Sequence, residues 1–123
     1  EVYTVEIIPE LAERAEETLE AQGYADVHCK QGDGYYGWPE EAPFDGIIVT
    51  AAPDHVPPPL REQLAVGGRM VIPIGPRGGY QTLWQFVKQP DGELKAYNKG
   101  GVAFVPFTGK GIRGNEEGGA WPP

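Results

Sequence analysis

Residues 44–53 read Phe-Asp-Gly-Ile-Ile-Val-Thr-Ala-Ala-Pro, and this stretch decides the fold that we predict for the chain. Its centre, residues 46–49, is a short run rich in β-branched residues, with no alternation of apolar and polar side chains. Such a run is typical of a strand buried on both faces of a parallel sheet. The small residues after it would let a ligand approach the backbone at the carboxyl end of the strand, where open α/β sheets bind ligands. The alternative is a core strand that simply ends in a tight turn.

Strand and helix patterns alternate on either side of this stretch. We predict strands at residues 2–6, 27–31 and 69–74, and helices at residues 9–22 and 60–65. Pro9 suits the first turn of the first helix, and Gly23 suits its end. This alternation predicts an α/β fold, in which a mostly parallel sheet carries helices on both faces.

The pattern changes in the second half of the chain. Residues 82–88 alternate, and Pro90-Asp91-Gly92 is a hairpin turn signal. Residues 94–97 and 102–107 would form the return strand, bulged at Gly100-Gly101. We therefore predict an antiparallel C-terminal hairpin. Residues 1–109 would form one domain, followed by a flexible Gly-rich tail over residues 110–123.

Composition excludes several classes of function. The net charge of −8 argues against binding to nucleic acid, and no apolar run is long enough to span a membrane. A single cysteine, Cys29, cannot form an internal disulfide and fits a reducing, cytoplasmic compartment. The chain contains no serine, which removes serine hydrolase chemistry. His28 and His55 have no neighbours at metal-ligand spacing, so we expect no metal site.

Two carboxylates follow neighbouring predicted strands. Glu6 ends the first strand and Asp33 follows the second, within Gly32-Asp33-Gly34. If these strands are parallel neighbours, both acids lie at the same edge of the sheet. A carboxylate there can accept hydrogen bonds from both hydroxyls of a ribose, and an acid between glycines can reach an exocyclic amine. Either acid alone reads as an ordinary turn residue, but the pair predicts a nucleoside site.

Several segments resemble a known enzyme family. Val5-Glu6, Gly32-Asp33-Gly34 and residues 64–75 are similar to class I S-adenosylmethionine-dependent methyltransferases, which have a Rossmann-like sheet. More specific segments resemble protein-L-isoaspartate (D-aspartate) O-methyltransferase. These segments are residues 42–53, residues 34–38 and Phe104-Val105-Pro106.

The resemblance implies a function and a set of binding residues. Such an enzyme transfers a methyl group from S-adenosylmethionine to the α-carboxylate of L-isoaspartyl residues in damaged proteins and peptides, its partners. The cofactor would contact Glu6 through its ribose, Ile7 through its adenine, and Asp33 and Gly34 through its adenine. The substrate would contact two segments, whose residues are Thr50, Ala51, Ala52 and Pro53, and Phe104, Val105 and Pro106.

The chain also departs from the family. The family's N-terminal region, with a Gly-rich turn after its first strand and a substrate-binding serine, has no counterpart here, so we expect a domain truncated before the first strand. No catalytic residue is assigned, and we expect the isolated chain to lack activity. Two alternatives stay open: a non-catalytic remnant that binds a nucleoside or peptide, and a class I methyltransferase for another substrate.

Overall fold

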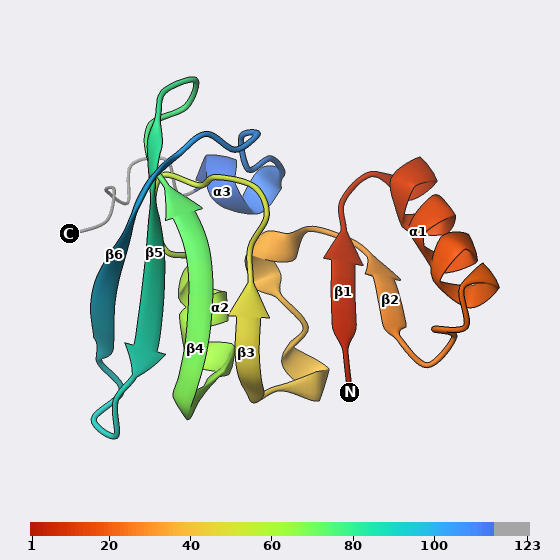
Figure 1. Cartoon of the computed structure of the whole chain (residues 1–123), viewed down its shortest axis with the longest axis horizontal. Coiled ribbons are helices and arrows are strands. Elements are labelled where there is room, and N and C mark those ends of the chain that lie inside the picture. The colour runs from red at the N-terminus through yellow and green to blue at the C-terminus, as the bar shows by residue number, and fades with distance from the viewer. Residues whose placement is uncertain (115–123) are drawn as a thin grey trace.

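The computed structural model of the chain describes residues 1–114, and residues 115–123 lie outside the described residues. The elements follow the predicted alternation (Figure 1). In chain order they are β1 (Tyr3–Glu6), α1 (Pro9–Ala21), β2 (His28–Gln31), η1 (Gly34–Tyr36), η2 (Pro39–Glu41), β3 (Phe44–Ile48), α2 (Pro58–Gln63), β4 (Leu64–Ile74), β5 (Gln81–Lys88), β6 (Leu94–Val102) and α3 (Lys110–Gly114).

The strands form two sheets. β1 and β2 make a parallel pair, and β3, β4, β5 and β6 lie in that order in a four-stranded sheet. β3 pairs with β4 in parallel, and both β4–β5 and β5–β6 are antiparallel. The predicted parallel pairing is confirmed for β1–β2 and for β3–β4, although β1 and β3 form no ladder with each other. The predicted hairpin is also confirmed, but its return strand β6 ends at Val102 and does not continue to Phe107.

Proline and glycine set the predicted turns and ends. Pro9 occupies the first turn of α1. At the β5–β6 hairpin, the N–H of Gly92 donates to the carbonyl of Gln89 at 2.9 Å, and Gly92 has a φ of +87° that favours glycine. The β5–β6 register shifts near Gly100, where φ is +109°, so the predicted bulge is confirmed.

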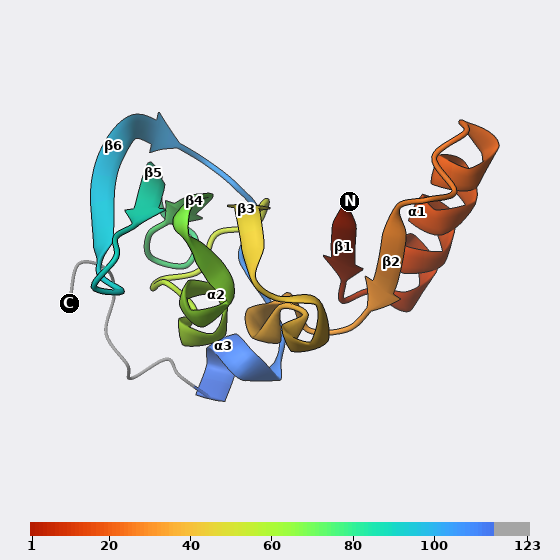
Figure 2. The same ribbon diagram turned by 90° about the horizontal axis from the view of Figure 1, so that it is seen from below.

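The main core lies on one face of the four-stranded sheet. Leu60 of α2 packs there against strand residues; the buried cluster is Leu60, Leu64, Met70, Ile72, Ile74 and Phe86. A second cluster of Tyr35, Phe107 and Ile112 joins η1 to α3. Figure 2 shows α2 and α3 on the same side of this sheet, with no helix of the described chain on its other side.

Three expectations need correction. β3 is not buried on both faces, because Ile47 packs on the core whereas the Ile48 side chain is 78% exposed on the uncovered face. Helices therefore do not cover both faces of the four-stranded sheet. The second helix ends at Gln63 because Leu64 already pairs with Phe44 in the sheet.

Aromatic side chains connect the two sheets. The Tyr3 ring on β1 makes edge contacts with Trp38 at 5.3 Å and with Phe44 of β3 at 5.7 Å between ring centroids. The Tyr3 ring also stacks on the His28 ring of β2, at 4.6 Å between ring centroids. Offset and edge contacts of this kind add stabilisation beyond the area that they bury. These contacts join the β1–β2 pair to the four-stranded sheet, with which it shares no strand ladder in the described part of the chain.

Candidate functional site

The loops after β1, β2 and β3 leave the strands at the same edge of the molecule, as the strand arrows show (Figure 1). Paired strands bring the first two loops together. Glu6 lies opposite Gln31 in the ladder, and the N–H of Gly32 donates to the carbonyl of Glu6 at 2.9 Å. The turns that hold Glu6 and Asp33 are therefore neighbours at the carboxyl end of the small sheet.

Glu6 lies over the turn into α1. Its side chain is half-buried, and Oε2 accepts a hydrogen bond from the N–H of Ile8 at 3.2 Å. The side-chain amide of Gln31 donates to the carbonyl of Ile7 at 2.8 Å. These contacts fix the backbone and the carboxylate directly after β1, in a position open to a hydroxyl-bearing ligand.

Asp33 uses both carboxylate oxygens within the fold. Oδ1 accepts a hydrogen bond from the N–H of Tyr35 at 3.0 Å and caps η1. Oδ2 accepts one from the N–H of Gly111 in α3 at 2.9 Å. The contact with adenine remains a prediction. The bond to Tyr35 is the turn role that the sequence offered as the alternative, whereas the bond to Gly111 was not indicated by the sequence pattern.

Gly109 lies between two of the predicted residues. A Cβ atom at this position would approach Asp33 Oδ2 to 2.7 Å and Ile7 Cδ1 to 2.8 Å, and its φ of +123° also favours glycine. Ile7 and Gly109 line a pocket of about 430 Å³; the others are Ile8, Pro9, Arg77, Thr108 and Arg113. The structure thus brings Ile7 and Asp33 together around Gly109, a position that sequence reasoning missed.

The two segments predicted to bind substrate lie side by side. Ala52 and Pro106 form a parallel bridge. The N–H of Ala52 donates to the carbonyl of Val105 at 2.7 Å, and the N–H of Phe107 donates back to the carbonyl of Ala52 at 3.0 Å. Segments about fifty residues apart in the sequence therefore form one small surface.

The side chains of this surface differ in exposure. Ala52 and Pro53 are buried and Ala51 is half-buried, whereas Thr50 and Pro106 are exposed. Val105 is 68% exposed and Phe104 is 37% exposed. The exposed members can contact a peptide through their side chains, and the buried members form the layer beneath them.

A buried hydrogen-bonded chain lies directly behind this surface. Tyr35 is 2% exposed, and its hydroxyl lies 2.9 Å from Nε2 of His55. Nδ1 of His55 lies 2.7 Å from Oδ1 of Asp54, and His55 is only 8% exposed. Burial raises the pKa of the Tyr35 phenol, so the hydroxyl stays protonated and can donate. No spacing signal points to this chain, because Tyr35 and His55 are twenty residues apart.

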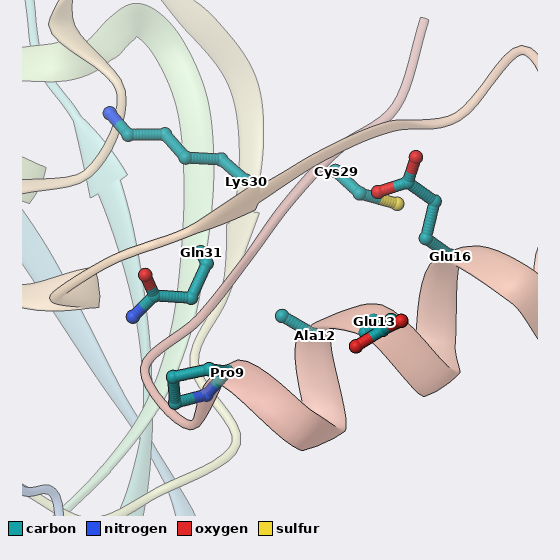
Figure 3. A pocket seen from close by; sticks show the side chains of 7 residues that line it. All are labelled: Pro9, Ala12, Glu13, Glu16, Cys29, Lys30 and Gln31. Carbon is teal, nitrogen blue, oxygen red and sulfur yellow. The ribbon is translucent and has the colours of Figure 1, made fainter.

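A second pocket, of about 270 Å³, lies between α1 and β2 (Figure 3). It is lined by Pro9, Ala12, Glu13, Glu16, Cys29, Lys30 and Gln31. Cys29 and Glu16 point toward one another from the two elements. Burial, followed by the Glu16 carboxylate, raises the pKa of the Cys29 thiol. Two of its residues connect it to the predicted binding residue Ile7: Gln31 donates to the Ile7 carbonyl, and Pro9 also lines the pocket that Ile7 lines.

Within residues 1–114, no group of three or more His, Cys, Asp or Glu side chains is arranged to hold a metal ion. Over the same residues, none of the helices combines the length and the apolar composition that a membrane span requires.

The parallel strands, the loops gathered at their carboxyl ends and the antiparallel β5–β6 hairpin define a Rossmann-like methyltransferase fold. The family model for protein-L-isoaspartate(D-aspartate) O-methyltransferase matches residues 1–111. The chain belongs to this family.

Curated relatives agree with this assignment. The protein-L-isoaspartate O-methyltransferase of Gloeobacter violaceus is 53% identical over 110 residues, which are 88% of this chain and 52% of that protein. The enzyme of the same name from Pyrococcus abyssi is 51% identical over 110 residues, covering 89% of this chain and 51% of that protein. The chain therefore spans about half the length of the curated relatives that it matches.

Solved structures show the same fold. A protein-L-isoaspartate O-methyltransferase structure matches 94% of this chain and 38% of its own chain, with a TM-score of 0.83 and 32% identity. A putative protein-L-isoaspartate O-methyltransferase from Plasmodium falciparum, in complex with S-adenosyl-L-homocysteine, matches with a TM-score of 0.75 at 22% identity. The match covers 87% of this chain and 52% of the Plasmodium chain.

Proposed function

We propose that this chain carries cofactor-binding and substrate-binding residues of a protein repair methyltransferase. The reaction transfers a methyl group from S-adenosylmethionine to the α-carboxylate of L-isoaspartyl residues in damaged proteins and peptides. The observation that carries the proposal is the bridge between Ala52 and Pro106. This bridge joins the two segments that the family resemblance assigns to substrate binding. The turns that the resemblance assigns to cofactor binding lie beside them.

The residues present fit the nucleoside part of the cofactor. Glu6 offers a half-buried carboxylate, an acceptor suited to ribose hydroxyls. Ile7 supplies an apolar wall in the pocket of about 430 Å³, and Asp33 with Gly34 lies on the other side of Gly109. When bound, S-adenosylmethionine supplies an electrophilic methyl group on its sulfonium. The residues of this chain bind and orient the two reactants. In a positioning mechanism, this orientation supplies much of the rate.

Methyl transfer measured on the protein expressed from its natural coding sequence tests the proposal. We expect radiolabelled methyl incorporation into an isoaspartyl peptide and none into the matched aspartyl peptide. Methylation of both peptides alike would favour a methyltransferase for another substrate. Binding of S-adenosylhomocysteine without methyl transfer would favour a nucleoside-binding or peptide-binding remnant.

A binding experiment tests the cofactor residues separately. Glu6→Ala is expected to weaken the affinity for S-adenosylhomocysteine by roughly 1–3 kcal/mol, because ribose hydroxyls lose their acceptor. Glu10→Ala, at an exposed position on α1, is the control and should leave the affinity unchanged. Equal affinities for the Glu6 and Glu10 variants by calorimetry would remove Glu6 from the site.

The proposal extends to the setting of the reaction. Isoaspartyl-containing proteins are the partners, with no part for nucleic acid, in agreement with the net charge of −8. We also propose a reducing, cytoplasmic compartment, supported by Cys29, which is a free thiol.

A further inference from the structure

We propose that Tyr35, His55 and Asp54 form a positioning chain that couples the cofactor turn to the substrate surface, so that one ligand strengthens the binding of the other. This inference rests on the function proposed above and adds residues to which that function gives no role. Tyr35 follows directly after the cofactor pair Asp33 and Gly34, and His55 follows shortly after the last residue of the first substrate segment. Their side chains meet behind both sites.

The hydrogen bonds of the chain have defined directions. The Asp54 carboxylate can only accept, so its contact with Nδ1 of His55 at 2.7 Å places a proton on Nδ1. In a neutral imidazole Nε2 is then the acceptor for the Tyr35 hydroxyl, 2.9 Å away. One tautomer of a neutral imidazole satisfies both contacts. The side-chain orientation of His55 is therefore fixed from both ends.

Tyr35 also connects with the third segment of the site. Its ring makes an edge contact with Phe107 at 6.4 Å between centroids. A Cβ atom at Gly111 would lie only 2.6 Å from Tyr35 atoms, so α3 lies directly against the ring. Asp33 links the same two elements by accepting hydrogen bonds from the N–H groups of Tyr35 and Gly111.

Three segments consequently share one buried centre. They are the cofactor turn after β2, the substrate segment after β3, and the segment from Phe104 to Gly111 that returns after β6. A ligand that orders the first segment would order the other two through Tyr35, and the second ligand would then bind a surface that is already ordered. Positive coupling of this kind must be reciprocal in the two affinities.

The first arm of the test measures this coupling by calorimetry on the protein expressed from its natural coding sequence. Binding of an isoaspartyl peptide is measured with and without saturating S-adenosylhomocysteine. In the unmodified protein the nucleoside should strengthen peptide binding by roughly fivefold or more. Tyr35→Phe and His55→Ala should bring this ratio close to one, and His55→Gln, which restores a polar amide near Nε2, should recover part of it.

Tyr36→Phe is the matched control. Tyr36 is the next residue and is 50% exposed, and its ring makes an edge contact with Tyr35 at 5.4 Å between centroids. Tyr36→Phe keeps this ring contact and removes a hydroxyl outside the chain from Tyr35 to His55 and Asp54. Asp54→Asn changes a half-exposed position and is the alternative test variant if the Tyr35 or His55 variants fail to fold. It should lower the ratio as well, because the amide replaces the acceptor for the Nδ1 proton with a weaker one.

The second arm follows amide hydrogen exchange without ligand in the 123-residue chain. Tyr35→Phe should speed exchange at Ala52 and Phe107 by about fivefold, the factor for one lost hydrogen bond, while Ile72 in β4 keeps its rate. An unmodified protein that binds neither ligand would refute the proposed function itself. An unmodified protein that binds both, with a coupling ratio that Tyr35→Phe and His55→Ala leave unchanged, would overturn only the positioning chain. Equal acceleration at Ile72 would likewise reduce Tyr35 to a general packing residue.

Discussion

Removal of the Asp33 side chain should destabilise the fold far more than its half-buried position suggests. Asp33→Ala deletes two acceptors at once, one for the N–H of Tyr35 at 3.0 Å and one for the N–H of Gly111 at 2.9 Å. Loss of a capping Asp costs about 0.5–2 kcal/mol. Gly111 is buried, and the loss of the hydrogen bond from its N–H to Asp33 adds about 1 kcal/mol, the net value of one such bond. The expected loss in the free energy of unfolding is therefore about 1.5–3 kcal/mol.

Two further variants make this prediction specific. Asp33→Asn keeps one acceptor oxygen and should lose only about 1 kcal/mol. Asp45→Ala is the matched control, because Asp45 also precedes a glycine but is exposed. A surface substitution of this kind should stay within about 0.5 kcal/mol of the unmodified chain.

Urea denaturation followed by circular dichroism measures these differences, with hydrogen exchange at Gly111 as a local readout. Exchange at Gly111 should rise in the two Asp33 variants before the strands of the main core are affected. If Asp33→Ala is no less stable than Asp45→Ala, the carboxylate does not anchor α3 and the reasoning is refuted.

The remaining predictions concern the core, the thiol and chain ageing. Phe86→Ala should lower the free energy of unfolding, measured by urea denaturation, by about 3–5 kcal/mol because the ring is fully buried. Tyr97→Ala, at a side chain that is 39% exposed, should lower it clearly less. Equal losses would contradict the placement of Phe86 in the core. Cys29 should react with iodoacetamide more slowly at pH 7.5 in the folded chain than in urea, because its raised pKa lowers the thiolate fraction, and the rate should climb as the pH passes the ordinary thiol value of 9.0. A faster reaction in the folded chain than in urea would show that folding does not raise the pKa of the Cys29 thiol. On ageing, peptide mapping should find isoaspartate first at Asp91, which is exposed in the hairpin before Gly92, and an earlier appearance elsewhere would contradict this.

Much of the fold could be predicted because its signals are local. Pro9 and the apolar spacing of residues 11–19 determine α1, and the turn around Gly92 determines the hairpin. Parallel pairing followed from strand–helix alternation, which depends on chain connectivity rather than on distant contacts. The exposure of Ile48 could not be predicted, because an apolar run specifies a strand but not what covers each of its faces.

In the candidate site too, positions set by the order of the elements could be predicted, whereas contacts between distant segments could not. The positions of Glu6 and Asp33 at neighbouring strand ends followed from the pattern of elements. The partner of His55 did not, because Tyr35 approaches it only through tertiary packing and no motif relates the two. The burial of Gly111 was also hidden, since a Gly-rich stretch with few apolar residues predicts a loose tail. The structure instead forms α3 over Lys110–Gly114, and the domain boundary at residue 109 stays a prediction, with residues 115–123 outside the described part of the chain.

The hydrogen bond from Gly111 to Asp33 spans 78 residues of sequence, and this separation determines when the edge of the sheet can assemble during synthesis. Residues 33–36 leave the ribosome long before the segment that completes their contacts, while elongation proceeds at about 5–20 residues per second. The nascent chain can form α1 and the β1–β2 pair early, since their contacts are close in sequence. The edge at which β1, β2 and β3 end, the candidate binding edge, closes only after residues 104–111 have been made. A ligand present during translation therefore meets a scaffold first and a finished edge several seconds later.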